Sequence, residues 1–219
     1  MAVGCHYVSA ILRRLTGYVS CNRECRIFPW KDFVLETRLG RITRERTVDD
    51  VRVAKFWQRY IATNKGIVSS RSPAEIKWMF GGAIEAGKLV FLTMEDEKGI
   101  VGWIILHSSD KSLGRWSIYD WIALENDENR LEQLLICAKV FLNKCTPAWY
   151  LETHGFSDGV QPILKRQLPN CIWKKGGDVF VYSFWDEEFK QKVKTLDYPD
   201  SWFFGVYDGD ACWQWHCEM

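Results

Sequence analysis

The stretch from Arg115 to Leu142, RWSIYDWIALENDENRLEQLLICAKVFL, decides the fold. Its first third alternates like a β-strand, and the part after residue 127 repeats apolar residues with the spacing of an amphipathic helix. A strand that leads directly into a helix is a common place to bind an anion, because the helix start presents free N–H groups and a partial positive charge. Here the junction has no glycine and carries Glu125, Asp127 and Glu128, which repel an anion. The junction therefore has the scaffold of a phosphate site without its usual residues.

The composition indicates a folded domain with no global bias of charge. The chain has 219 residues, 47% of them apolar, and its 12 Trp, 12 Phe and 8 Tyr exclude disorder as the main state. The 29 basic and 28 acidic side chains give a net charge of +1, so nucleic acid is not an expected partner. The best candidate for a local basic patch is a set of five arginines near the start of the domain: Arg38, Arg41, Arg44, Arg46 and Arg52.

Membrane attachment and secretion are not expected. The sequence has no apolar run of about 18 residues, the length that a transmembrane helix needs. The charged pair Arg13–Arg14 follows the first apolar stretch, which is the wrong order for a secretory signal. We therefore expect a cytoplasmic protein.

The eight cysteines do not have the spacing of a structural zinc site. We expect reduced thiols and no metal, with Cys137 on the apolar face of a helix as a core residue. The alternative is a zinc site that joins Cys21, Cys25, Cys212 and Cys217.

The pattern of apolar residues predicts three parts: an N-terminal extension over 1–32, a main domain over 33–185 and an aromatic C-terminal extension over 186–219. A short helix is one option for the first 30 residues. In the main domain the predicted helices are 48–63 with Thr47 as N-cap, 72–86 with the capping box Ser72-Pro73-Ala74-Glu75, 127–143 and 158–168. The predicted strands are 33–44 with a turn or bulge near Gly40, 88–94, 100–107, 115–124, 147–153, and a hairpin of Trp173 with 179–184.

From Phe33 to Phe184 this order, β-α-α-β-β-β-α-β-α-β-β, resembles the GNAT superfamily of N-acyltransferases. The resemblance implies an α/β (α+β) fold with a mixed, mostly antiparallel central sheet flanked by helices. It also implies that strands 115–124 and 147–153 splay apart and hold the pantetheine arm of an acyl donor between them. The donor would then contact the backbone near Ile122, Ala123 and Leu124. The superfamily's pyrophosphate loop, [RQ]-x-x-G-x-[GA], is replaced by residues 125–130, which leave three polar candidates for the donor: Asn126, Asn129 and Arg130.

Within the same strand, Asp120-Trp121-Ile122-Ala123 resembles the D-W-I-A-P motif of bacterial toxin-activating acyltransferases, with Leu124 in place of proline. That family is GNAT-like, lacks the pyrophosphate loop and takes acyl chains from acyl carrier protein. The resemblance implies a catalytic role for Asp120. The family's N-terminal histidine has no clear counterpart, because His6 lies in a different context.

Asp120 is the leading catalytic candidate. Strand alternation predicts that it shares a face with Ile118 and Ile122, where a carboxylate needs a raised pKa or a firm hydrogen-bond partner. One interpretation is a general base that deprotonates an amine. The other is a structural residue satisfied by backbone N–H groups or by Arg115. Further candidates for acid–base chemistry lie at strand ends: Glu152, His154, His107 and Tyr150.

Two functions remain open. The first is an N-acyltransferase without a tightly bound cofactor, with acyl-CoA or acyl carrier protein as co-substrate. The second is an inactive GNAT-like module that binds a protein partner through its aromatic C-terminal region, for example in a bacterial or viral complex. The first requires a slot beside Asp120 that Trp116, Trp121 and Trp149 do not fill.

Overall fold

A six-stranded sheet forms the centre of the molecule. The computed structural model describes residues 32–64, 66–110, 115–145, 150–152, 160–168 and 202–203. The strands lie in the order β1-β2-β4-β5-β6-β7, and every neighbouring pair is antiparallel except β6 and β7. Their bounds are β1 Val34–Thr37, β2 Gly40–Glu45, β4 Leu89–Asp96, β5 Gly99–Asp110, β6 Arg115–Ala123 and β7 Tyr150–Glu152. A separate two-stranded parallel sheet joins β3 (Ile67–Val68) to β8 (Trp202–Phe203).

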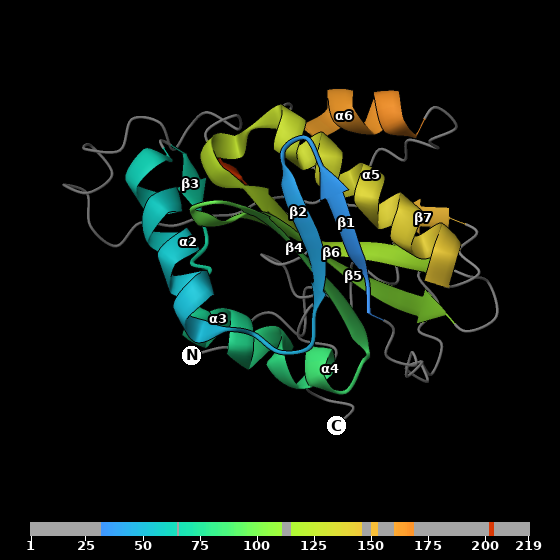
Figure 1. Ribbon diagram of the computed structural model, residues 1–219, viewed down its shortest axis with the longest axis horizontal. Coiled ribbons are helices and arrows are strands. Elements are labelled where there is room, and N and C mark those ends of the chain that lie inside the picture. Colours follow the sequence, from blue (N-terminus) through green and yellow to red (C-terminus); the bar gives the residue numbers. More distant parts are fainter. Residues whose placement is uncertain are drawn as a thin grey trace, which may run out of the picture.

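Helices cover both faces of the sheet (Figure 1). On one face Phe56 packs its ring 4.3 Å from that of Trp103, and on the other Leu134 lies against Gly102. The first face is covered by α2 (Asp50–Thr63) and by the short series α3 (Pro73–Ile76), η1 (Lys77–Gly81) and α4 (Gly82–Glu85), and the second by α5 (Glu128–Cys145), on which α6 (Val160–Gln167) packs. The predicted fold class, a mixed and mostly antiparallel sheet flanked by helices, is confirmed.

The two central strands β4 and β5 are buried on both faces. Leu89 to Met94 are all buried, as are Ile100 to Ser108. A strand between two helical layers reads as a continuous apolar run because both of its faces meet protein. Trp103 lies at the centre of this core and also contacts Phe91 edge-on.

The predicted helix starts are partly confirmed. Ser72 and Glu75 form the expected capping box at α3. Burial raises the pKa of Glu75, but hydrogen bonds from Ser70 and Ser72 outweigh it, and the pKa lies below its usual value. At α2 the N-cap is Asp49 and not Thr47, because the Asp49 carboxylate accepts the N–H groups of Val51 and Arg52 at 3.0 Å.

Other predicted bounds changed in detail. The segment predicted over 33–44 is the hairpin β1–β2, with its turn just before Gly40 as predicted. The helix predicted over 72–86 is interrupted by the π-helical turn η1. The turn between β4 and β5 is shorter than the predicted span of residues 95–99, since Asp96 already pairs with Gly99. The N-terminal helix and the hairpin of Trp173 lie outside the described residues, as do Cys21, Cys25, Cys212 and Cys217, so the zinc alternative does too.

We expect Gly40→Ala to destabilise the protein by about 2–4 kcal/mol, from backbone strain and overpacking together. Gly40 has φ +140°, and an added Cβ would lie 2.3 Å from the carbonyl oxygen of Glu95. Gly82→Ala is the matched control, because Gly82 is helical and an added Cβ would meet nothing within 4 Å. It should stabilise by roughly 0.4–1 kcal/mol. Urea unfolding of both variants measures the difference, and equal effects would contradict the β2–β4 register.

Candidate functional site

Strand β6 contains a β-bulge at Tyr119. Ile105 pairs with Asp120, while its neighbour Leu106 pairs with Ile118, so β6 has one extra residue at this point. A bulge of this kind shifts the alternation of side chains between the two faces. The prediction that Asp120 shares a face with Ile118 is therefore wrong. Asp120 lies on the face that α2 covers, together with Ile122.

Asp120 forms a buried ion pair with Arg71, which lies in the loop between β3 and α3. The Arg71 Nε and Nη2 atoms donate to Asp120 Oδ1 at 3.1 and 3.0 Å. The indole N–H of Trp103 donates to Asp120 Oδ2 at 2.7 Å. Arg71 also donates through Nη1 to the carbonyl oxygen of Ser69 at 2.7 Å. The side chains of Arg71 and Asp120 are 0% and 1% exposed, so protein surrounds the pair completely.

This geometry agrees with the structural interpretation of Asp120. Both carboxylate oxygens accept charge-assisted or neutral hydrogen bonds from neighbouring side chains, and the Asp120 side chain is buried. A general base needs an oxygen within hydrogen-bond reach of the proton that it removes. Arg71 is therefore a partner of the carboxylate that sequence reasoning did not identify.

The junction between β6 and α5 binds its own carboxylate. Leu124–Asn126 form the short 3₁₀ turn η2, in which Glu125 and Asn126 have φ values of +61° and +51°. Asn126 is held there by the hydroxyl of Tyr60, which donates to Asn126 Oδ1 at 2.9 Å. Asp127 Oδ1 accepts the backbone N–H groups of Asn129 and Arg130 at 2.8 and 3.1 Å. The backbone N–H groups that would bind a phosphate at such a helix start therefore already donate to Asp127.

We expect Asp127→Ala to cost about 0.5–2 kcal/mol of stability, because the helix start loses its cap. Asp127→Asn is the control, since an asparagine oxygen accepts the same two N–H groups and should cost far less. Chemical denaturation of the two variants measures the difference. Equal losses would show that the contact of Asp127 with Asn129 and Arg130 does not stabilise the helix.

Three neighbouring strands bring two of the predicted acid–base candidates into one row. His107 on β5 pairs with Ser117 on β6, and Ser117 pairs with Glu152 on β7. His107 and Ser117 lie on the same face as Asp120. His107 is 2% exposed, and its ring lies 5.0 Å from that of Tyr119.

Not every candidate belongs to this row. Tyr150 pairs with Arg115, and His154 lies outside the described residues. Sequence reasoning did not identify Ser117, because strand alternation gives the face of a residue but not its cross-strand partner.

The tryptophans of β6 lie on the face opposite Asp120. Trp121 pairs with Ile104 and donates its indole N–H to the carbonyl oxygen of Leu131 in α5 at 3.0 Å. Trp116 pairs with Ser108, also on the α5 face, and both rings are buried. Neither therefore fills the space beside Asp120. Arg71 and Trp103 occupy it instead, so the open slot that the acyltransferase interpretation expects beside Asp120 is not found there. Trp149 lies outside the described residues.

The predicted basic patch is largely neutralised. Arg41 and Arg46 pair with Glu36 and Asp32 at 3.6 and 3.1 Å. Arg44 is buried, with its guanidinium 5.5 Å from the ring centre of Phe141. Arg52 lies between Glu45 and Glu95 at 2.9 and 2.8 Å. Four of the five arginines therefore contact acidic or aromatic groups of the protein.

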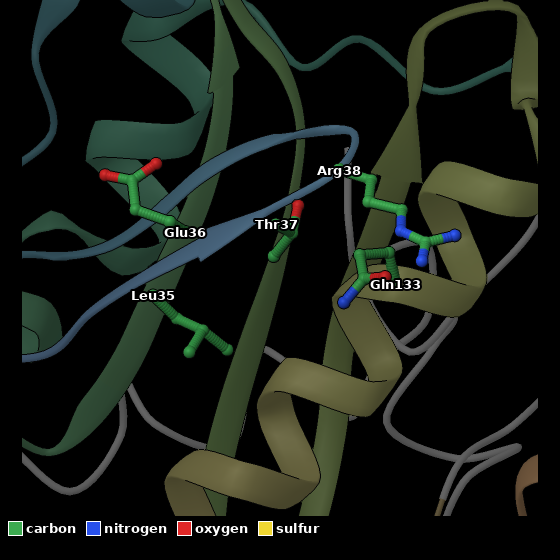
Figure 2. Close-up of a pocket in the computed structure, with 5 residues that line it drawn as sticks. All are labelled: Leu35, Glu36, Thr37, Arg38 and Gln133. Atoms are coloured by element: carbon green, nitrogen blue, oxygen red, sulfur yellow. The ribbon is translucent and has the colours of Figure 1, made fainter.

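An open hollow lies between the edge strand β1 and helix α5, on the face opposite Asp120 (Figure 2). Residues of β1, the following turn and α5 line it: Leu35, Glu36, Thr37, Arg38 and Gln133. None of the predicted catalytic or donor-binding residues lines this hollow.

Other predictions concern metals and membranes. Cys137 is buried with a free thiol, as predicted, and burial raises its pKa. In the part of the chain that the structure describes, no three His, Cys, Asp or Glu side chains are grouped to hold a metal ion. None of the described helices is long and apolar enough to cross a membrane.

Comparisons with known proteins relate the chain only to solved structures. No family model and no curated protein sequence matches it. A probable acetyltransferase is 15% identical, with a TM-score of 0.43, over 65% of this chain and 95% of its own. A ribosomal-protein-alanine N-acetyltransferase from Brucella melitensis biovar Abortus 2308 is 10% identical, with a TM-score of 0.44, over 65% and 99%. An aminoglycoside acetyltransferase from an uncultured soil metagenomic sample, in complex with sisomicin, is 12% identical, with a TM-score of 0.43, over 65% and 95%.

From β1 to α6 the described strands and helices follow the order predicted from the sequence, and β6 and β7 are the parallel pair within an otherwise antiparallel sheet.

Proposed function

We propose that this chain is an N-acyltransferase that moves an acyl group from a thioester donor to an amine. The pairing of β6 carries the proposal. Within the described residues β7 pairs with β6 only at Arg115, Trp116 and Ser117, and β6 continues to Ala123. An extended arm with amide groups can hydrogen-bond to the edge of a strand as a further strand does. Pantetheine is such an arm, and the backbone of Ile122 and Ala123 is where we expect it.

The donor is held mainly through its pantetheine arm. At the start of α5 the carboxylate of Asp127 accepts the N–H groups of Asn129 and Arg130, and Glu125 and Glu128 add negative charge beside it. A pyrophosphate would have to displace one carboxylate and approach two others. This arrangement favours acyl carrier protein over acyl-CoA as donor, because its prosthetic group has no adenosine diphosphate to place there.

In the proposed reaction the amine nitrogen attacks the carbonyl carbon of the thioester. The C–N bond forms, the C–S bond breaks, and the thiol of the donor leaves. Glu152, which stands at the end of β7 opposite Ser117, is our candidate for the base that takes the amine proton. His154 and His107 are the alternatives, and Tyr150 is a candidate acid for the thiolate. Asp120 positions β6 through Arg71 and does not itself touch substrate.

A second function is an inactive interaction module with a GNAT-like fold. Two observations favour it: the carboxylate of Asp120 is paired with Arg71, and the carboxylate of Asp127 accepts backbone N–H groups of its own helix. The aromatic C-terminal region is then the surface for a protein partner, as the sequence predicts.

Thermal unfolding with added ligand separates the two functions. The ligands are CoA, acetyl-CoA, S-acetyl-pantetheine and an acetylated acyl carrier protein. A ligand at a hundred times its dissociation constant adds about 2.7 kcal/mol, or roughly 5–11 °C for this size of protein. We expect the carrier protein and S-acetyl-pantetheine to raise Tm, and acetyl-CoA to bind no more tightly than S-acetyl-pantetheine. No shift with any of the four would favour the interaction module.

A further inference from the structure

Strand β1 forms one edge of the six-stranded sheet, and in the described part of the chain no strand pairs with its outer side. Its side chains are accessible, since Val34 is 49% exposed and the Glu36 side chain 75%. Leu39, in the turn to β2, is also exposed. An edge strand with accessible apolar residues is a template on which another strand can pair.

Every second residue of β1 directs its backbone N–H and C=O groups away from the sheet. The carbonyl oxygen of Phe33 accepts the N–H of Arg44 at 3.0 Å, so the backbone carbonyl of Phe33 points toward β2. In an antiparallel pair this direction alternates along the strand. Val34 and Glu36 therefore direct their backbone groups outward, where a further strand can bond to them.

Only one antiparallel register of two β1 strands suits both the backbone and the charges. A hydrogen-bonded pair must join two outward residues, so Val34 pairs with Val34, Val34 with Glu36, or Glu36 with Glu36 of the second copy. The first register places Asp32 opposite Glu36, and the third places two Glu36 carboxylates opposite each other, and both arrangements are unfavourable. The second register places Leu35 opposite Leu35 and Asp32 opposite Arg38. It joins opposite charges twice and bonds both outward residues of each strand.

We propose that this protein forms a symmetric dimer in which the β1 strands of two copies pair antiparallel, with Leu35 at the two-fold axis. Both copies use the same surface, so the assembly is closed after two copies. The two sheets become one continuous sheet with α5 of both copies on the same face. Leu35 also lines the hollow between β1 and α5, so the hollows of the two copies adjoin at the axis (Figure 2).

The charged residues at the ends of the paired strands are accessible to a second copy. Asp32 contacts Arg46 at 3.1 Å, but the Asp32 side chain is 81% exposed and has room for Arg38 of the second copy. The dimer also leaves the proposed donor site open, because β6 and β7 lie at the other side of the sheet from β1. The inference therefore stands independently of the proposed function.

Charge reversal in the full chain tests the dimer. Arg38→Glu places a carboxylate opposite Asp32 of the second copy, and Asp32→Arg places a guanidinium opposite Arg38. In a mixed dimer of these two variants every such contact again joins opposite charges. Lys55→Glu is the matched control, since it reverses an exposed cation on α2. Sedimentation equilibrium measures the molar mass over concentrations from about 1 µM to 1 mM.

We expect the unsubstituted protein to change from monomer to dimer within that range. Each reversal should raise the Kd of the dimer at least about tenfold, because two contacts change from attraction to repulsion. An equimolar mixture of Arg38→Glu and Asp32→Arg should dimerise as the unsubstituted protein does, and Lys55→Glu should leave the Kd unchanged. The amides of Val34 and Glu36 should exchange hydrogen more slowly in the dimer than in the monomer.

A protein that stays monomeric over the whole range would overturn the proposal. Slow exchange of Val34 and Glu36 in that monomer would show that another part of the chain covers β1, and fast exchange would show that the edge stays open. A dimer that neither reversal weakens would also overturn it, because its interface would then lie elsewhere.

Discussion

Arg71→Ala is expected to lower the free energy of unfolding by about 3–5 kcal/mol, because it leaves the Asp120 carboxylate buried without its cation. For a protein of this size the loss corresponds to a fall in Tm of roughly 6–20 °C. The burial of both side chains makes the effect large, since Arg71 is 0% exposed and Asp120 only 1%. Differential scanning calorimetry at pH 7 measures it.

A surface ion pair provides the control for this prediction. Arg166 contacts Glu132 at 3.1 Å, but the Arg166 side chain is 50% exposed. Exposed pairs contribute about 0–1 kcal/mol, so Arg166→Ala should change Tm little. The double variant Arg71→Met with Asp120→Leu removes both buried charges together and should recover most of the stability. A loss for Arg71→Ala as small as that for Arg166→Ala would show that the buried pair does not form.

Glu152→Gln should reduce acyl transfer by about 10²–10⁴-fold while Tm changes by no more than a few degrees, since a positioned base contributes about that factor. Glutamine keeps the size and the strand position of Glu152 but cannot take a proton. The measurement is the rate of amide formation from an acetylated carrier protein, followed by mass spectrometry. The loss should appear in kcat, because the proton is transferred during the reaction and not when the substrate binds.

Two other variants make the assignment to Glu152 specific. Glu36→Gln changes a carboxylate on the edge strand β1 and should leave the rate unchanged. His107→Gln tests the alternative base on β5, on the other side of Ser117. A full loss with His107→Gln and none with Glu152→Gln would move the base to His107.

The sequence predicted the order of elements and much of the local chemistry. The Ser72–Glu75 capping box, the strand–helix junction at residues 115–142 and the core role of Cys137 depend on neighbouring residues, which a sequence pattern displays directly. The acidic residues at the start of α5 are visible in the sequence, but only the structure shows that the Asp127 carboxylate accepts the N–H groups of Asn129 and Arg130.

The features that sequence reasoning missed depend on contacts between distant residues. The bulge at Tyr119 adds one residue to β6 and moves Asp120 to the other face, and strict alternation cannot reveal it. Arg71 lies 49 positions from Asp120, in a serine-rich loop with no period. The pairing of Trp202 with Ile67 joins an aromatic tail without a clear pattern to the main domain. A lone arginine between serines was the only signal for the buried pair.

Transfer of an acyl group is the most direct test of the central claim. The folded full chain is incubated with acyl carrier protein bearing a ¹³C-labelled acetyl thioester and with a lysine-containing peptide, and the products are weighed. We predict a labelled amide and an equal amount of free carrier thiol, with amide formation about 10²–10⁴-fold slower in Glu152→Gln. The claim would be contradicted if the folded protein forms no amide from the carrier thioester, from S-acetyl-pantetheine or from acetyl-CoA.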